Sequence, residues 1–354
     1  FRAQRRGGKG RSAMSTKDED IVTELFVTST HTPVLFFSTL GKVYRMKVWR
    51  LPEGGPNTRG RPMVNLLPLA KDETISTVLP LPEDEAEWGK LHVMFATAKG
   101  SVRRNSMDAF TNMPSNGKIA MKLPEGVELV NARICSEDDD VMLTTNSGRA
   151  IRFASTDLRV MNSRASTGVR GIRLTGDDMV VSMSVIRHFE ATPEERAAYL
   201  KMRRALAGVT DEEAGEDDVP ADPNFSQERY EEMAAVENLI LTITRGGSGK
   251  LSSSHDYPVR GRGGMGVAAM DKAMRGGPVV ASFPVELVDQ IMLVTSTGQS
   301  IRCPIDGISF RSRNAGGVRV FNTSRDEQVV SVAYIPDQGD GEDTPEESTS
   351  EADS

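Results

Sequence analysis

A unit of about fifty residues recurs along this chain, and the repetition limits the possible folds more than any single motif does. Each unit contains two short runs of β-branched and aromatic residues on either side of a glycine, a pattern typical of a β-hairpin. Hairpins are predicted at residues 34–45, 93–103, 141–152, 239–251 and 291–302. Their turns contain Gly41, Gly100, Gly148 and Gly298, and the looser fourth hairpin has Gly246, Gly247 and Gly249 in its turn. This repetition predicts an all-β chain.

A polar segment that contains glycine follows each hairpin, and we call this segment a box. Boxes 1 to 6 are residues 4–10, 57–61, 115–118, 166–170, 262–266 and 313–317, marked by Gly8, Gly60, Gly117, Gly168, Gly264 and Gly316. Successive markers lie 52, 57, 51, 96 and 52 residues apart, and removing the 48 residues 190–237 reduces the fourth interval to 48. We therefore expect six units of about four strands each, numbered as their boxes, of which unit 1 lacks its opening hairpin.

A fixed period of this length with all-β content is typical of a propeller-like ring of blades. A doubly wound α/β fold would require amphipathic helices of about 10–15 residues between its strands, and the units contain none. We therefore expect one all-β, six-bladed domain over residues 1–336.

Residues 190–237 interrupt the ring between the third and fourth complete blades, and they predict a helical hairpin on the surface. The first helix has an N-cap, a proline at its first position, acidic residues in its first turn and a closing glycine, at Thr192, Pro193, Glu194, Glu195 and Gly208. A second helix is expected from about residue 227 to 237, and residues 211–223 between the two are expected to be flexible. Two roles remain open, a surface elaboration without a function of its own and a docking or autoinhibitory element.

The net charge of −7 hides a division of charge along the chain. Residues 337–354 hold eight acidic residues and no lysine or arginine, and they predict a disordered acidic tail. The insertion 190–237 holds fourteen acidic and five basic residues, so the rest of the chain carries a formal charge of +10. A basic body with acidic appendages is typical of a protein that binds a polyanion.

No catalytic or metal-binding constellation can be assembled from the sequence. His31, His92, His188 and His255 lack metal-ligand spacing and are expected at surface or turn positions. The only cysteines, Cys135 and Cys303, have no pairing pattern, so they are expected to be reduced and non-catalytic in a cytosolic protein. No apolar run reaches the length of about 18 residues that a membrane span needs, and no charged-then-apolar leader opens the chain.

Two short motifs that resemble nucleotide-binding loops lack their structural context. Residues 261–266 match GxGxxG, and Glu286 follows twenty residues later, but the preceding segment is a poor strand and no helix follows. Residues 248–251 lack the serine or threonine that follows the lysine of a P-loop. Neither motif predicts a bound cofactor.

Basic residues recur in or beside every box. They are Arg5, Arg6, Lys9 and Arg11 at box 1, Arg59 and Arg61, Lys118, Arg164 and Arg170, Arg260 and Arg262, and Arg311 and Arg313. Because a ring of blades places equivalent loops on one surface, these residues predict a basic belt for the phosphates of curved duplex DNA. Aromatic residues make up only 5 % of the chain and do not accompany the boxes, which argues against base stacking on single strands. The alternative is that the cations only keep the loops soluble.

Box 1, which reads Gln4-Arg5-Arg6-Gly7-Gly8-Lys9-Gly10, resembles the signature box of the C-terminal domain of the DNA gyrase A subunit. Residues 60–69 and 167–174 are similar to further segments of that family, and the resemblance extends from residue 4 to about 335. It implies a six-bladed β-pinwheel in which each blade is completed by a strand from its neighbour. It also implies that the domain wraps duplex DNA with positive handedness, and that the seven residues of box 1 act in wrapping.

The resemblance further implies an assembly in which this domain has no chemistry of its own. The partners would be double-stranded DNA and, in an A2B2 holoenzyme of the bacterial cytoplasm and nucleoid, the gyrase B subunit with the remainder of the gyrase A subunit. ATP and Mg²⁺ would act in that holoenzyme, outside this chain, and the isolated domain would be a monomer. The insertion departs from the simplest family pattern. The alternatives are the corresponding domain of topoisomerase IV, which generally has a degenerate box, and a propeller-like protein-interaction scaffold.

Overall fold

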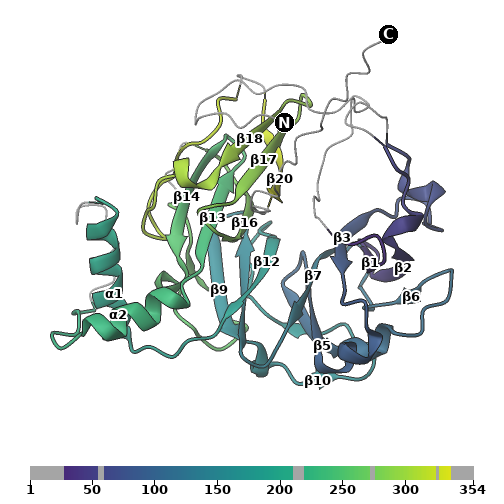
Figure 1. The fold of residues 1–354 in the computed structure, drawn as a ribbon, viewed down its shortest axis with the longest axis horizontal. Coiled ribbons are helices and arrows are strands. Elements are labelled where there is room, and N and C mark those ends of the chain that lie inside the picture. Colours follow the sequence, from purple (N-terminus) through teal and green to yellow (C-terminus); the bar gives the residue numbers. More distant parts are fainter. Residues whose placement is uncertain (1–27, 55–59, 210–218, 272–275, 324–326, 336–354) are drawn as a thin grey trace, which may run out of the picture.

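The computed structural model describes residues 28–54, 60–209, 219–271, 276–323 and 327–335, and these residues form five sheets, antiparallel but for one short strand, that are arranged in an arc (Figure 1). Each sheet contains the two hairpin strands of one unit and a third strand that pairs with the first of them. The strands are β1 (Pro33–Ser38), β2 (Lys42–Lys47) and β3 (Ile75–Pro80) in unit 2; β4 (His92–Thr97), β5 (Ser101–Ser106) and β7 (Leu129–Cys135) in unit 3; β8 (Asp139–Thr145), β9 (Arg149–Ala154) and β12 (Val180–Arg187) in unit 4; β13 (Leu239–Thr244), β14 (Ser248–Ser253) and β16 (Val279–Val285) in unit 5; and β17 (Gln290–Thr295), β18 (Ser300–Pro304) and β20 (Val329–Ile335) in unit 6. All five predicted hairpins are confirmed.

Very short strands at the boxes link each sheet to the next unit. They are β6 (Lys118–Ile119), β11 (Val169–Arg170), β15 (Val267–Ala268) and β19 (Val318–Arg319), and they pair with β2, β5, β9 and β14 of the preceding units. A further strand, β10 (Val160–Met161), pairs parallel with β5. The structure thus confirms the expectation that a blade is completed by a strand from its neighbour.

Short 3-10 helices occupy several of the connections. They are η1 (Val48–Arg50), η2 (Met63–Asn65), η3 (Glu85–Lys90), η4 (Met107–Phe110), η5 (Ser155–Asp157), η7 (Ser254–Asp256) and η8 (Ile305–Gly307). Five of them directly follow the second hairpin strand of a unit, so the chain leaves each hairpin in the same way before it enters the box.

We call the short strands at the boxes exchanged strands, because each pairs with the sheet of the preceding unit. The hairpin turns show why this exchange requires glycine. Gly41 has a φ of +77°, and its carbonyl accepts the backbone N–H groups of Ala120 and Met121 at 2.8 and 3.0 Å. A Cβ on Gly41 would lie 2.2 Å from the Met121 carbonyl oxygen, so a larger residue would push the exchanged segment away. One glycine therefore both makes the turn and admits the neighbouring unit.

The looser fourth hairpin corrects one detail of the sequence interpretation. Gly246 and Gly247 lie in the turn, but Gly249 belongs to β14. A Cβ on Gly317 would lie 2.8 Å from the Gly249 nitrogen, so two glycines meet where the segment of box 6 approaches β14. This strand position holds glycine because a Cβ on Gly249 would lie 2.3 Å from Cδ1 of Ile243 and 3.0 Å from the Thr242 carbonyl oxygen.

The apolar core is divided into layers between consecutive sheets. In the layer between units 2 and 3, Phe37 packs edge-on against Phe95 and Phe110, with ring centroids 5.4 and 6.0 Å apart. Equivalent buried clusters join units 3 and 4, units 4 and 5, and units 5 and 6. Each sheet therefore shares a buried apolar layer with its neighbours along the arc.

The insertion forms the expected helical hairpin, which lies outside the arc (Figure 1). Helix α1 (Pro193–Leu206) begins with a capping box, in which Thr192 and Glu195 exchange side-chain and backbone hydrogen bonds, and α2 (Gln227–Ala235) ends two residues earlier than expected. The insertion covers His255, which lies in η7 with only 3 % of its surface exposed and bonds through Nε2 to the Met233 carbonyl at 2.8 Å. His255 is thus in a turn but buried, because the helices pack over it. No described helix is both long and apolar enough to cross a membrane.

Candidate nucleic-acid interface

The boxes are joined to one another in succession by their arginines. Arg164 beside box 4 donates through Nη1 to the Ile119 carbonyl at 3.1 Å, and Arg262 of box 5 donates through Nη1 to the Arg170 carbonyl at 3.1 Å. Arg313 of box 6 donates through Nη1 to the Ala268 carbonyl at 2.8 Å. Each acceptor is the second residue of the preceding exchanged strand. Boxes 3 to 6 therefore form one continuous line that follows the arc of the sheets.

Backbone contacts reinforce this line between boxes 4 and 5. The N–H of Gly263 donates to the Gly171 carbonyl at 2.6 Å, and the N–H of Arg173 donates to the Gly264 carbonyl at 2.8 Å. Gly263 has a φ of +86°, which residues other than glycine rarely adopt. The glycines of the boxes thus allow adjacent loops to approach each other at backbone distance.

The basic residues of the belt differ in how far their side chains are exposed to solvent. Exposed residues are Arg61, Arg170, Arg260 and Arg262, and half-buried ones are Lys118, Arg164 and Arg311. Arg313 is only 7 % exposed, and its Nε donates to the Asp256 carbonyl at 2.8 Å in addition to its bond with Ala268. Box 1 (Gln4, Arg5, Arg6, Gly7, Gly8, Lys9, Gly10), Arg11 and Arg59 lie outside the described residues. Contact with DNA stays a prediction for every member of the belt.

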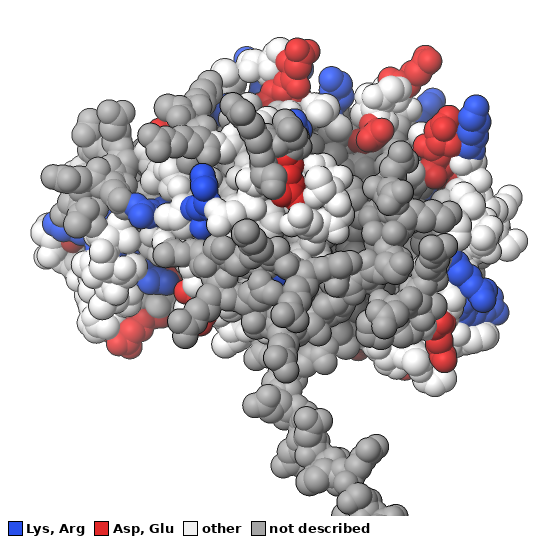
Figure 2. Space-filling view, turned by 90° about the horizontal axis from the view of Figure 1, so that it is seen from above, with Lys and Arg blue, Asp and Glu red and all other residues white. Residues whose placement is uncertain are grey.

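The face seen from above in Figure 2 shows lysine and arginine side chains separated by acidic and uncharged residues. Among the described residues visible there, the cations do not merge into one broad basic patch. A polyanion that meets this face would therefore contact separate basic positions.

A second set of cations, which the sequence interpretation missed, is buried beneath the boxes. Lys250 on β14 donates through Nζ to the backbone carbonyls of Ser312 and Ala315, at 2.8 and 2.7 Å, and also to that of Arg313. Burial lowers the pKa of Lys250 to about 7. These bonds hold the loop of box 6 from below.

Arg103 on β5 has the same role in an earlier unit of the arc. Its Nη1 donates to the carbonyls of Arg164 and Ser166 at 2.8 and 2.6 Å, and its Nη2 bonds to that of Ala120. Burial lowers the pKa of Arg103 to about 10. The available signal was its place in the repeat, since Arg103 and Lys250 both stand three residues after a turn glycine.

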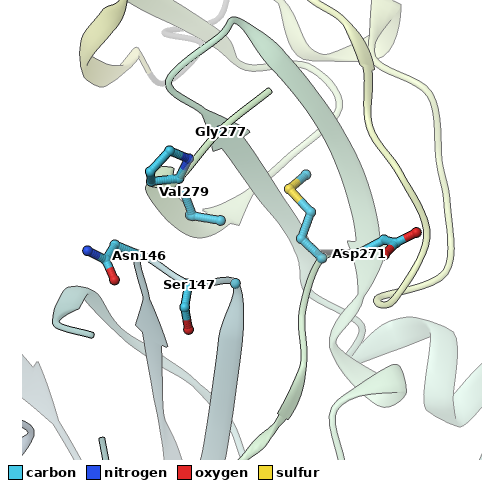
Figure 3. A pocket seen from close by; sticks show the side chains of 8 residues that line it. Asn146, Ser147, Asp271, Gly277 and Val279 are labelled. Carbon is cyan, nitrogen blue, oxygen red and sulfur yellow. The ribbon is translucent and has the colours of Figure 1, made fainter. Parts of the chain in front are cut away.

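A cavity of about 260 Å³ lies between the hairpin turn of unit 4 and the segment that precedes β16 (Figure 3). Asn146, Ser147, Asp271, Gly277 and Val279 are among the residues that line it, and the Ser147 hydroxyl donates to Asp178 at 2.7 Å. None of its described lining residues is a lysine or arginine. The cavity therefore lacks the charge that a phosphate site requires.

Side chains that could ligate a metal do not cluster in the described part of the chain. No cluster of three or more histidine, cysteine or acidic residues with metal-binding geometry is present among the described residues. Cys135 and Cys303 are unpaired and buried, and burial raises the pKa of their thiols to about 12 and about 11. Both thiols are thus protonated at neutral pH and poorly nucleophilic.

A family model described as "DNA gyrase C-terminal domain, beta-propeller" matches residues 1–29, 32–82, 91–136, 139–187, 238–283 and 289–336. The chain belongs to this family. The matched segments coincide with the six units and omit the helical insertion, while the structure describes sheets for five of the units.

Two relatives, both A subunits of DNA gyrase by name, extend the comparison along the chain. The protein of Rickettsia bellii is 46 % identical over 342 residues, which cover 96 % of this chain and 38 % of the relative. That of Granulibacter bethesdensis is 47 % identical over 364 residues, which cover 97 % and 39 %. The chain thus spans about two fifths of the length of these relatives.

Two solved structures share the fold of this gyrase family. A DNA gyrase A C-terminal domain matches with a TM-score of 0.69 at 21 % identity, over 95 % of this chain and 93 % of that one. The C-terminal domain of a DNA topoisomerase IV matches with a TM-score of 0.64 at 18 % identity, over 86 % and 80 %. At these identities the matches establish the architecture alone.

Proposed function

We propose that this domain binds duplex DNA along its line of boxes and bends the duplex around the arc of sheets. The observation that carries the proposal is the succession of box arginines, each bonded to the exchanged strand of the box before it. A rigid curved row of basic loops matches what bent DNA requires, which is phosphate contact along a convex path without base readout. Membership of the gyrase C-terminal domain family supports the same function.

Bending explains why a continuous row is needed. Curving 20–30 base pairs of duplex costs on the order of 1–10 kcal/mol, which many phosphate contacts together must offset. Exposed cations such as Arg61, Arg170 and Arg260 would supply these contacts, and loop backbone N–H groups would add further donors.

The finer proposal concerns the assembly in which the domain works. It would wrap DNA with positive handedness and present the wrapped segment to the DNA gate of a type II topoisomerase in the bacterial cytoplasm. In an A2B2 assembly, the gyrase B subunit with the remainder of the gyrase A subunit would supply the catalytic groups, ATP and Mg²⁺. Strand passage would then introduce negative supercoils. Within this chain, Gln4, Arg5, Arg6, Gly7, Gly8, Lys9 and Gly10 would anchor the wrap.

Ligation in the presence of the domain tests both binding and handedness. A nicked circular plasmid is sealed by ligase with increasing amounts of protein, the protein is removed, and the linking number is measured. We expect a positive shift that rises with dose, and a variant with Arg61, Arg170 and Arg260 changed to alanine should shift it less. Binding without a shift would favour a topoisomerase IV-type role, and absence of binding would favour a protein-interaction scaffold.

A further inference from the structure

The helical insertion is attached to the loop that carries box 6. The guanidinium of Arg203 on α1 lies over the ring of Phe310, 4.6 Å from its centroid, and its Nε pairs with Glu237 at 3.0 Å. Phe310 immediately precedes Arg311 and the box. These contacts place the C-terminal half of α1 beside one end of the described line of boxes.

A cavity of about 220 Å³ lies between α1 and this loop. Lys201 and Arg204 reach it from α1, Ser312 and Asn314 line it from the loop of box 6, and Asp256 of η7 also borders it. Two cations and two neutral groups able to donate hydrogen bonds thus face one carboxylate.

Two donors at this cavity have no partner within the described chain. Ser312 is only 4 % exposed, and its hydroxyl makes no hydrogen bond. The Nε of Arg204 is also buried without a partner. A buried donor without an acceptor is unfavourable, so these atoms favour a ligand that brings acceptor oxygens.

The carboxylate at the cavity is already engaged by box 6. The backbone N–H of Arg313 donates to Oδ2 of Asp256 at 2.7 Å, and Nε of Arg313 lies 3.5 Å from Oδ1. Burial also raises the pKa of Asp256, which disfavours its negative charge. Asp256 therefore orders the loop of box 6, and the positive charges of Lys201 and Arg204 favour a negatively charged ligand.

We propose that this cavity binds a backbone phosphate of duplex DNA, so that the insertion extends the DNA-binding surface beyond box 6. The inference rests on the proposed function, because the ligand is assigned to DNA from the position of the cavity at one end of the line of boxes. Lysine and arginine provide the charge, while the hydroxyl of Ser312 and the amide of Asn314 orient the phosphate oxygens.

The test compares the whole chain with a variant carrying Lys201→Ala and Arg204→Ala. Binding of a labelled duplex is measured by anisotropy over a series of salt concentrations. Removing two phosphate contacts should lower the log–log salt slope by about 1.8, from about 0.9 per contact. A control with Lys71→Ala and Lys90→Ala, which removes two exposed charges outside the boxes, should keep the wild-type slope. Thermal melting checks that each variant is folded.

A second variant, Ser312→Val, removes the buried hydroxyl without changing charge. It should weaken binding about fivefold at every salt concentration and leave the slope unchanged. If the wild type binds DNA but the double variant keeps its affinity and slope, the cavity inference is wrong and the proposed function stands. If the wild type does not bind duplex DNA, both fail. If the double variant loses affinity for inorganic phosphate but keeps its affinity for the duplex, the cavity binds a free anion and the DNA assignment is wrong.

Discussion

At the scale of single residues, the cations of this chain have two different roles. Exposed arginines such as Arg170 are available to a ligand, whereas Lys250 and Arg103 donate to backbone carbonyls of the next unit. Arg313 belongs to a box, yet it is buried and donates to backbone carbonyls as Lys250 and Arg103 do. Counting basic residues therefore overestimates the charge that DNA can reach, and the position of each cation in its unit decides its role.

Lys250 allows this distinction to be measured. Because burial lowers its pKa to about 7, the folded chain releases the proton in a pH range where the unfolded chain keeps it, up to the usual value of 10.5. The contribution of Lys250 to the free energy of unfolding should therefore increase as the pH rises above 7, because the unfolded chain binds the extra proton. Lys250→Met should cost about 3 kcal/mol at pH 9, where its carbonyl partners lose their donor, and about 1 kcal/mol at pH 7.

Urea unfolding of both proteins at pH 7, 8 and 9 measures this difference. Taking the difference removes the contributions of other groups that titrate in the same range, including the two buried thiols. Lys118→Met, a change in a half-buried cation on β6, serves as the control and should show no such trend. A difference that does not vary with pH would mean that Lys250 stays charged throughout, held by its three carbonyl partners.

At the scale of elements, the exchanged strands are what make the units into one structure. They are only two residues long, too short to specify pairing by their own side chains. Their register is set instead by the turn glycine of the preceding unit, whose carbonyl accepts two consecutive N–H groups, as Gly41 does from Ala120 and Met121. The exchange therefore depends on backbone proximity at a few glycines.

Two glycines with nearly identical backbone angles provide a matched test. Gly41 and Gly298 have φ values of +77° and +78°, but a Cβ on Gly298 would meet no described atom within 4 Å. Gly298→Ala should cost about 1 kcal/mol, for the left-handed conformation alone. Gly41→Ala should cost about 3 kcal/mol or more, because its Cβ also collides with the Met121 carbonyl. Equal losses in chemical denaturation would show that the turn, and not the exchanged segment, is what Gly41 serves.

At the scale of the whole molecule, each sheet packs against its neighbours along the chain, so the arc is built by repetition. In such a structure stability is close to a sum of unit and interface terms, and a surface feature repeated in every unit becomes a path along the arc. The helical insertion adds to that path at one place without interrupting the sheets of units 4 and 5 on either side.

Box 1 makes a prediction at this scale, since it carries the densest charge of the six. Changing Arg5, Arg6 and Lys9 together to alanine should lower the log–log salt slope of duplex binding by about 2.7, if each cation neutralises one phosphate. The linking-number shift should fall more steeply than the affinity. Without its anchor at box 1 the bent DNA can straighten, because bending costs free energy, while the remaining boxes still bind the duplex locally. An unchanged slope together with an unchanged shift would remove box 1 from the mechanism.

The amino-acid sequence was enough to predict the all-β class, the five described hairpins and the two helices of the insertion, because alternation, turn glycines and capping residues act over a few neighbouring positions. It also located the boxes, because they recur at a fixed period. The folded structure was needed to show that Arg313 is buried, that Gly249 lies in a strand, and that Lys250 and Arg103 support box loops. Those outcomes depend on contacts between residues about sixty positions apart. The loop that a neighbouring unit packs against a cation decides whether that cation is exposed or bonded to a carbonyl.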